Sequence, residues 1–370
     1  SAFLLNRSSD LMLIWRSLLG FSIPIMISNL VQSTYNAVDM LFVGRFTGTE
    51  SLAAVSVCGP IMNVMIITLS GMSAGVLVVI SGLLGAGDIK QAQDAAHTSV
   101  ALAAVMTVLG LLFVPQILRL VQTPAAAMPE AKRYLYTVFA GTVFTFGYNL
   151  IGALQRGLGN AAASMSFVII SSAANIALDA VFIVWLGMGA FGAALGTVLS
   201  QVAAFVIGTV QFARGGAALR LSARAVRFHK KHLKNILLFG VPTALNEVMV
   251  NLAMLTVSGV ANSFGLASSA AYGVGSRINS LAIFTDGAMN QTMSAYASQN
   301  IGAGRQKRAL EGLWKAIILS AGAALGTSLL VLGFASEFSA CFDSDPTVIE
   351  QSAAFLRVTV WSYPLFATVG

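Results

Sequence analysis

The sequence contains few charged residues. Of its 370 residues, 9% are Asp, Glu, Lys or Arg, whereas 56% are hydrophobic. A typical soluble domain carries about 25% charged residues, so this composition excludes a soluble domain with a single anchor. The apolar runs lack the alternation of barrel strands, which favours a helical bundle over an outer-membrane barrel. The sequence therefore predicts an all-α polytopic membrane protein.

Residues and motifs for covalent, metal or nucleotide chemistry are also scarce. The two cysteines, Cys58 and Cys341, lie far apart. The three histidines, His97, His229 and His232, fall in predicted loops without the spacing of metal ligands. The sequence has no P-loop, and no Ser/His or His/Glu constellation falls at membrane depth. We therefore expect neither an ATP-driven pump nor an enzyme, and no cofactor.

Hydrophobic runs separated by clusters of Gly, Asp and Pro predict ten membrane-spanning helices. They lie at about residues 16–41, 51–84, 95–118, 131–153, 160–185, 190–213, 233–263, 267–300, 309–334 and 349–370.

Positive charge gathers between the sixth and seventh predicted spans, at Arg214, Arg220, Arg224, Arg227, Lys230, Lys231 and Lys234. Lys and Arg concentrate in cytoplasmic loops, so we expect a cytoplasmic N-terminus and even-numbered spans that return to the cytoplasm. This distribution explains the net charge of +7 without nucleic acid. Binding of anionic lipid by the basic loop is an alternative to a pure topology signal. The expected location is the inner (plasma) membrane.

The chain repeats itself. Pro24 recurs as Pro242, and the turn Gly85-Ala-Gly87 recurs as Gly302-Ala-Gly304. A six-span unit duplicated in parallel predicts two pseudo-symmetric lobes that are related by an axis along the membrane normal and enclose a central cleft. We divide the chain into an N-lobe at 1–213, a basic linker at 214–232 and a C-lobe at 233–370.

The fifth and sixth spans have no counterpart before the last residue, so we expect the second lobe to be truncated after helix 10. Two further helices of spanning length would complete it. Because residue 1 is Ser rather than Met, an earlier start is also expected.

The first predicted span carries a polar stripe. Asn29, Gln32, Asn36 and Asp39 follow at spacings of three, four and three, which places them on one helical face, and Tyr35 lies beside them. A carboxylate at membrane depth is costly and normally faces a bundle interior or a watery cavity. The alternative is an aspartate at the helix end, among the lipid headgroups.

Further oxygen donors occur in the same half. Asn175 and Asp179 are four residues apart in the fifth span, and Asn149 and Thr197 lie in the fourth and sixth. Carboxylate, amide and hydroxyl oxygens suit a hard cation such as Na⁺. Two carboxylates in one low-dielectric cavity also suit a proton. The alternative is a set of interhelical hydrogen bonds without a transport role.

The second half contains its own intramembrane polar residues. Glu247 occupies the position of Asn29 in the repeat and shares a face with Asn251, and Asp286 lies in the eighth span. These residues predict a second-choice site for a cation or a substrate. Hydrogen bonds within or between the lobes are the alternative.

Taken together, six segments resemble the multidrug and toxic compound extrusion (MATE) family of transporters. They are NAVDMLFVGR, LLGAGDIKQA, QRGLGN, NIALDAVFIVW, PTALNEVMVN and ASQNIGAGRQKRA. The resemblance implies twelve helices in two six-helix lobes that form a V, and antiport of drugs against Na⁺ or H⁺.

The likeness to the archaeal and DinF-like branch implies a coupling-ion site at Asp39, Asn149, Asn175, Asp179 and Thr197, with Gln32, Tyr35 and Asn36 in support. Any Na⁺ would then be held at Asp39, Asn175 and Asp179. In that branch the proline that matches Pro24 permits bending of the first helix. In the NorM-like branch a glutamate matches Glu247 and is paired with an acid in span ten. Here span ten reads RVTVWSYPLFATVG and has no acid, so the N-lobe site is favoured.

The expected function is therefore secondary active multidrug efflux by a monomer in lipid, with drugs or toxic metabolites as substrates. One alternative is a lipid-linked oligosaccharide flippase of the same superfamily. That function would need a basic cavity, whereas the charges expected at membrane depth, away from the span ends, are four acids and one arginine, Arg277. A membrane-embedded enzyme and a non-transporting receptor are alternatives from other classes. An enzyme would need a reactive constellation at depth, and a receptor would not need buried acids.

Overall fold

A computed structural model describes residues 11–47, 49–214, 225–282 and 284–365, and every regular element in these residues is helical. The α-helices are α1 (Leu11–Phe46), α2 (Thr49–Gly85), α3 (Ile89–Leu120), α4 (Met128–Gly157), α5 (Ala161–Asp179), α6 (Gly189–Arg214), α7 (Lys230–Ser263), α8 (Leu266–Ala282), α9 (Phe284–Gly302), α10 (Gln306–Ala340) and α11 (Pro346–Thr359). A π-helix (Ala180–Trp185) follows α5, and a short 3₁₀ helix (Val360–Ser362) follows α11.

The prediction of an all-α polytopic membrane protein is confirmed. Within the described ranges, eight helices are long and apolar enough to cross a membrane. Helices α8 and α9, which flank residue 283, together cover the predicted span 267–300. Arg220 and Arg224 of the predicted basic linker lie outside the described residues, and so does the end of the last predicted span, residues 366–370.

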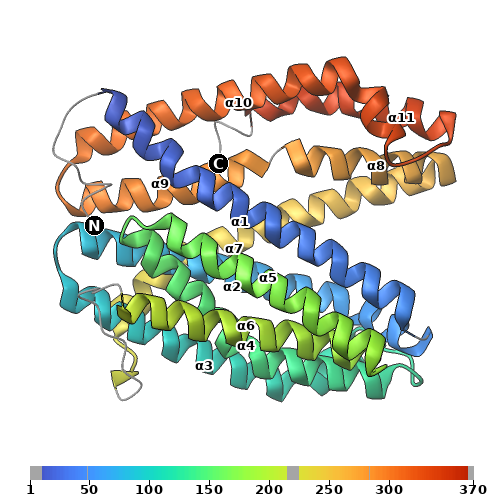
Figure 1. Cartoon of the computed structure of the whole chain (residues 1–370), viewed down its shortest axis with the longest axis horizontal. Helices are drawn as coiled ribbons and strands as arrows, with labels where there is room; N and C mark the ends of the chain where they lie inside the picture. Colours follow the sequence, from blue (N-terminus) through green and yellow to red (C-terminus); the bar gives the residue numbers. More distant parts are fainter. Residues whose placement is uncertain (1–10, 48, 215–224, 283, 366–370) are drawn as a thin grey trace.

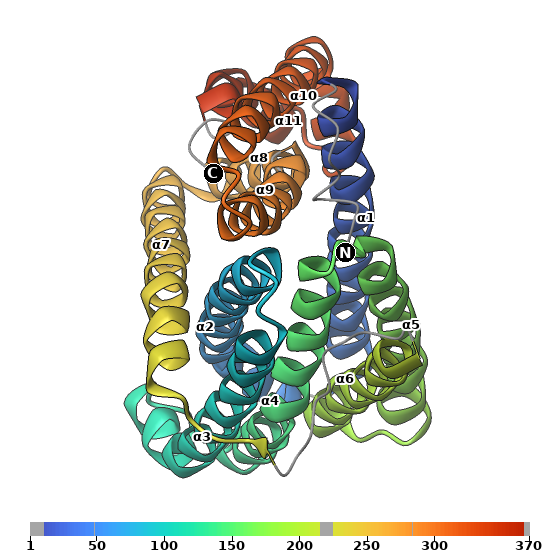
Figure 2. The same cartoon turned by 90° about the vertical axis from the view of Figure 1, so that its left-hand side faces the viewer.

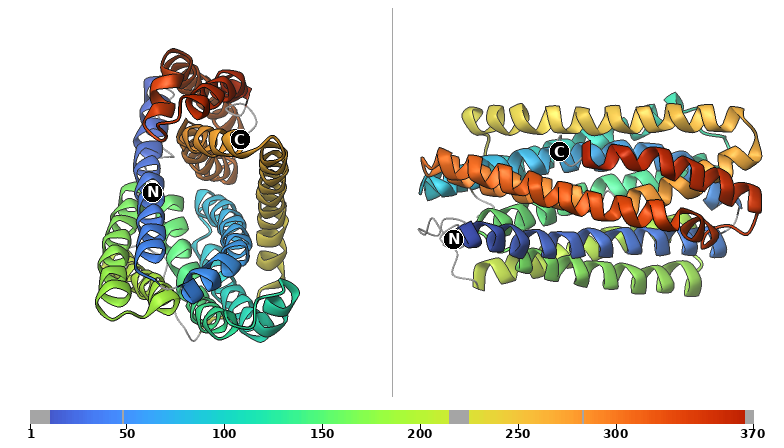
Figure 3. Two further views of the ribbon diagram at one scale, coloured as in Figure 1. Left: turned by 90° about the vertical axis from the view of Figure 1, so that its right-hand side faces the viewer. Right: turned by 90° about the horizontal axis from the view of Figure 1, so that it is seen from above.

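The helices form two groups joined by two oblique helices. Helices α2–α6 make one group and α8–α11 the other, as Figure 1 and Figure 2 show. Helix α1 runs diagonally between them and packs against both α5 and α9 (Figure 1). Helix α7 stands on the other side, along α2 (Figure 2). Figure 3 shows that the helices run roughly lengthwise through the molecule.

The hydrophobic core differs between the two ends of the bundle. We call the end that holds the turns 86–88, 158–160 and 303–305 the linker end, because α7 also begins there. At this end one buried cluster joins both groups of helices, from Ile14 and Val76 to Ile236 and Tyr296. Towards the opposite end, which we call the far end, the clusters separate. One contains residues of α2, α3 and α4 with the turn before α4. Another contains residues of α8, α10 and α11 with the 3₁₀ helix and Tyr363 directly after it.

Small residues allow the helix backbones to touch at the linker end. A methyl group on Gly75 would lie 2.4 Å from the carbonyl oxygen of Ile236 in α7. A methyl group on Gly302 in α9 would lie 1.9 Å from the carbonyl oxygen of Gly82 in α2. Because these close approaches join α2 to both α7 and α9, they close the linker end tightly.

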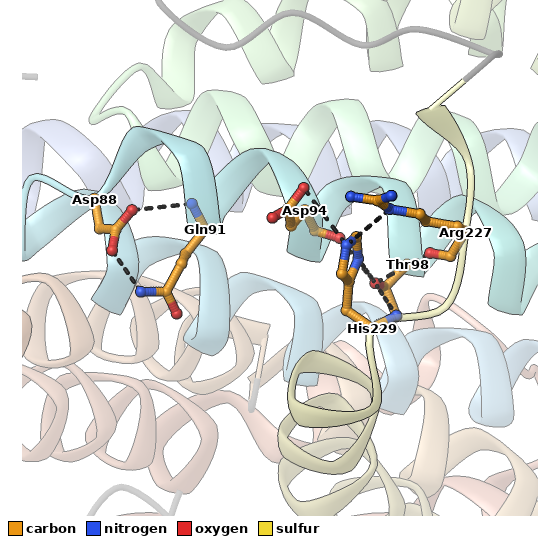
Figure 4. Close-up of polar contacts among 6 residues, drawn as sticks. All are labelled: Asp88, Gln91, Asp94, Thr98, Arg227 and His229. Carbon is orange, nitrogen blue, oxygen red and sulfur yellow. Dashed lines mark hydrogen bonds and ion pairs between the residues drawn. The ribbon is translucent and has the colours of Figure 1, made fainter.

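The segment before α7 is fixed to α3 by hydrogen bonds (Figure 4). The backbone N–H of His229 donates to Thr98 Oγ1 at 3.2 Å, and Arg227 Nε donates to His229 Nε2 at 3.0 Å. His229 Nε2 also lies 3.7 Å from Asp94 Oδ1. Lys231 adds a 3.0 Å bond to the side-chain oxygen of Gln91. We call this set of contacts the α3 clasp.

The predicted position of two histidines was wrong. His97 and His232 are buried within α3 and α7 rather than in loops. Helix α3 begins before its hydrophobic run because Asp88 caps it, accepting from the backbone N–H of Gln91 at 3.0 Å. The hydrogen bonds from Gln91 hold the pKa of Asp88 below its ordinary value.

Candidate ion-binding site

Two aspartates from different helices meet in the N-terminal group. Asp39 lies near the far end of α1, and Asp179 is the last residue of α5, which packs along α1. Their carboxyl groups are within hydrogen-bonding range of each other. Asp179 is 0% exposed, and Asp39 is half-buried. The structure therefore brings together the two acids that the sequence predicted for one site.

The protein leaves the buried oxygens of this pair without donors. Asp39 Oδ1 and both Asp179 oxygens accept no hydrogen bond from any described residue. Two ionised carboxylates cannot donate to each other, and buried polar atoms normally have a partner. One shared proton or one bound cation would satisfy these atoms and remove the repulsion between two negative charges.

The predicted amide of Asn175 lies in this region of α5, one helical turn before Asp179. It is 1% exposed, and neither its oxygen nor its nitrogen has a partner among the described residues. Asn149 instead turns its nitrogen to the carbonyl of Thr145 in its own helix, at 2.8 Å. Thr197 is half-buried on α6 and directly follows Gly196. Asn175 is therefore the better placed of these oxygen donors.

The polar stripe of α1 reaches the acid pair through Tyr35. Tyr35 is half-buried and lies near enough to Asp39 and Asp179 to interact with their charges. Gln32 and Asn36 are themselves exposed. Tyr134 of α4 also lies near enough to both acids to interact with their charges. We did not predict Tyr134, because its aromatic position resembles ordinary core in the sequence.

The second-choice residues lie on other helices. Glu247 is exposed on α7, and its backbone carbonyl accepts from Asn251 Nδ2 at 2.8 Å. Asn251 Oδ1 accepts from Asn63 Nδ2 of α2 at 3.4 Å, which links α7 to the N-terminal group. Asp286 is half-buried on α9, and the described residues place no second acid beside it. These residues do not form a paired-carboxylate centre like that of α1 and α5.

Three features at the acid pair were missed in the sequence. Ser172 is buried three residues before Asn175, and its hydroxyl has no partner within the described ranges. A π-helix begins directly after Asp179, and such turns are often found at functional sites. Gly196 of α6 lies against the Asp179 carboxylate. The spacing of Ser172 could have been recognised, whereas the π-helix left no signal in the sequence.

Two apolar hollows lie elsewhere, between α2, α3 and α4. One of about 360 Å³ is lined by residues that include Met65, Met106 and Thr142. The other, of about 560 Å³, includes Phe113 and shares Phe139 with the first. Neither is lined by Asp39 or Asp179. The candidate site is therefore defined by buried charge rather than by the size of a hollow.

The two groups of helices define a two-lobed helical membrane protein. The sequence profile of the MatE family matches residues 24–181 and 242–369, with one match in each half. The chain belongs to the MATE family. It is accordingly a multi-pass membrane protein, and the predicted repeat is confirmed, whereas the predicted DinF-like branch stays a prediction.

Named relatives agree with this assignment. The chain is 30% identical to the probable multidrug resistance protein YoeA of Bacillus subtilis (strain 168), over 95% of this chain and 79% of that protein. It is 23% identical to the multidrug export protein MepA of Staphylococcus aureus (strain MSSA476), over 94% of this chain and 78% of that protein.

Solved structures of MATE transporters share the fold. An outward-facing multidrug resistance MATE transporter of the MOP superfamily superimposes with a TM-score of 0.84 at 25% identity, over 95% of this chain and 81% of that one. A MATE in the straight conformation gives 0.84 at 26% identity, over 95% and 82% of the two chains.

Proposed function

We propose that this protein is a secondary active antiporter that exports organic, cationic or amphipathic compounds in exchange for H⁺ or Na⁺. The observation that supports this proposal is the pair formed by Asp39 and Asp179, whose buried oxygens have no donor in the described protein. Such a pair is costly to maintain at membrane depth without a bound ion. A structural hydrogen-bond network would instead satisfy its members from the protein.

The coupling ion is proposed to bind between the two carboxyl groups. A proton shared by the acids turns one of them into a donor for the other. Na⁺ would bind the same oxygens, with the side-chain oxygen of Asn175 as a third ligand, since carboxylate and amide oxygens suit hard cations. In both cases the ion cancels negative charge at the contact of α1 with α5.

Helix α1 is placed to transmit this change between the lobes. It packs on α5, which carries Asp179, and also on α9 of the other group. Pro24 interrupts the hydrogen bonding of α1, and Ser28 Oγ donates to the Pro24 carbonyl at 2.8 Å. We propose that ion binding alters the bend at Pro24 and thereby the packing of α1 between the lobes.

The state described here is proposed to face outwards. The lobes share a core at the linker end and have separate cores towards the far end. The basic residues beside α7 support a linker end that faces the cytoplasm, and we propose the inner (plasma) membrane as the location. In an outward-facing state, bound drug can leave to the outside, and ions from the outside can reach the acid pair. Coupling then requires that the ion and the drug have different affinities for the two states.

Reconstituted vesicles with Na⁺ and H⁺ gradients imposed separately test this function. Efflux of an organic cation such as ethidium should follow one gradient and stop when that gradient is collapsed. ATP should have no effect in either case. Drug movement that is independent of both ion gradients would reject the antiport proposal.

A further inference from the structure

Gly196 of α6 makes direct contact with the buried acid of α5. A methyl group on its Cα would lie 2.3 Å from Asp179 Oδ1, and 3.5 Å from both the Cγ and the backbone nitrogen of Asp179. This separation is too short for any carbon–oxygen contact, so a side chain at position 196 would displace the carboxylate. Asp179 is 0% exposed, so its carboxylate cannot be displaced without moving neighbouring protein atoms.

The same face of α6 also supports the π-helix. Gly192 lies one turn before Gly196, and a methyl group there would lie 3.1 Å from the carbonyl oxygen of Phe182. The π-helix starts at the residue after Asp179, and the N–H of Leu186 bonds to the carbonyl of Val181, five residues back. The two glycines therefore form a groove that receives both the carboxylate and the turn that follows it.

The contents of this groove distinguish it from ordinary close packing of small residues. In the contact of α6 with α4, Gly141 of α4 faces an apolar side chain, Val198 of α6. At Gly196 the neighbour is a buried carboxylate whose two oxygens have no donor among the described residues. The backbone of α6 thus limits the directions that this acid can take, and Asp39 of α1 is its neighbouring acid.

We propose that Gly196 is a positioning residue of the coupling-ion site, which by its lack of a side chain holds the Asp179 carboxylate towards Asp39. This inference rests on the proposed antiport function and adds a residue to it. Ion binding by two carboxyl groups depends on their separation and orientation. A methyl group at position 196 would alter both and leave the two acids themselves intact.

The test compares Gly196→Ala with Gly141→Ala. The methyl group at position 141 would lie 2.4 Å from Val198 Cγ2, so the crowding is similar but involves no carboxylate. Purified proteins are titrated with Na⁺ and, separately, with protons, while tryptophan fluorescence and the thermal midpoint are followed. We expect Gly196→Ala to weaken the apparent affinity for the coupling ion by about 10- to 100-fold. Gly141→Ala should lower the thermal midpoint and leave the ion affinity unchanged.

A double mutant tests whether Gly196 acts through the acid. In an Asp179→Asn background, Gly196→Ala should have no further effect on ion response or on ethidium binding, because the positioned group is already lost. Equal shifts in the two backgrounds would overturn the inference. Gly192→Ala is the milder second variant, for use if Gly196→Ala does not fold. It should weaken ion affinity in the same direction, and a wild-type titration of this variant would then overturn the inference.

The outcomes separate the inference from the function it rests on. A wild-type protein that responds to neither Na⁺ nor protons rejects the antiport proposal itself. A wild-type protein that responds, beside a Gly196→Ala protein that titrates like wild type or like Gly141→Ala, rejects only the role of Gly196.

Discussion

The side-chain amide of Gln299 in α9 donates a 2.8 Å hydrogen bond to the carbonyl oxygen of Gly157, at the end of α4. The side chain is 1% exposed, so the bond is shielded from water. It joins the two groups of helices at the linker end, beside the close approach of Gly302 to Gly82. Opening this end must break the bond.

Gln299→Ala should therefore favour opening of the linker end. Loss of a buried hydrogen bond costs about 1–3 kcal/mol, which raises the open population at least about fivefold. A thiol at position 81 reports the change, because Ser81 is 0% exposed. In a Cys341→Ser, Ser81→Cys protein, maleimide labelling should be faster when Gln299→Ala is added.

Ser298→Ala is the matched control for that experiment. The hydroxyl of Ser298 donates only to carbonyls of its own helix, Ser294 and Ala295. Its removal should leave the labelling rate unchanged. Equal labelling of the Gln299→Ala and control proteins would show that the Gln299 bond does not hold the lobes together.

The α3 clasp predicts a local effect of Thr98. Thr98→Val keeps the shape of the side chain and removes the acceptor for the His229 N–H. Because His229 is only part-buried, loss of this hydrogen bond costs about 1 kcal/mol, so protection of the amides at 229–233 from hydrogen exchange should fall about fivefold. Thr107→Val is the control, because Thr107 bonds only to Ala103 of the same helix. Unchanged exchange in Thr98→Val would mean that the clasp does not restrain the start of α7.

Asp88 predicts a pH dependence at the start of α3. Its pKa lies below the usual 3.8, because the carboxylate accepts from the backbone N–H and the side chain of Gln91. A carboxyl group with a lowered native pKa stabilises the folded state above its unfolded pKa. This contribution is lost as the pH falls through the native pKa. The exchange protection of the Gln91 amide should therefore fall in acid.

Asp88→Asn separates this charge from the cap. Asparagine retains an oxygen acceptor for the helix start but does not titrate. Protection of the Gln91 amide in this variant should vary less with acid than in the wild type, once each is corrected for intrinsic exchange. Identical pH profiles would mean that the charge of Asp88 does not stabilise α3.

Much of the fold could be predicted because a lipid environment constrains composition so strongly. The long apolar runs predicted the ends of most helices to within a few residues. Pro24 and Pro242, at equivalent positions in the two halves, indicated the repeat. The early start of α3 was missed because its first turns carry polar residues that resemble a loop, namely Lys90, Gln91, Gln93 and Asp94. The non-helical backbone at Phe334, inside α10, directly follows Gly333, which we treated as part of a continuous predicted span.

The acid pair could be predicted only in part. Helical spacing placed Asp39 on a polar face and Asp179 beside Asn175, and both acids had to avoid lipid. The spacing did not show that α1 lies along α5, since that depends on packing between distant segments. Gly196 was missed for the same reason, because a glycine in an apolar helix reads equally as a helix contact or as open space facing lipid.

Ion-driven drug efflux by Asp39→Asn provides the most direct test of the account. In energised vesicles, Asp39→Asn should fold and bind ethidium but lose efflux under the coupling gradient, because an amide cannot complete the acid pair with Asp179. Glu247→Gln, at the exposed glutamate of α7, should retain efflux. Wild-type efflux by Asp39→Asn would contradict the central claim that the buried acid pair is where the driving ion binds.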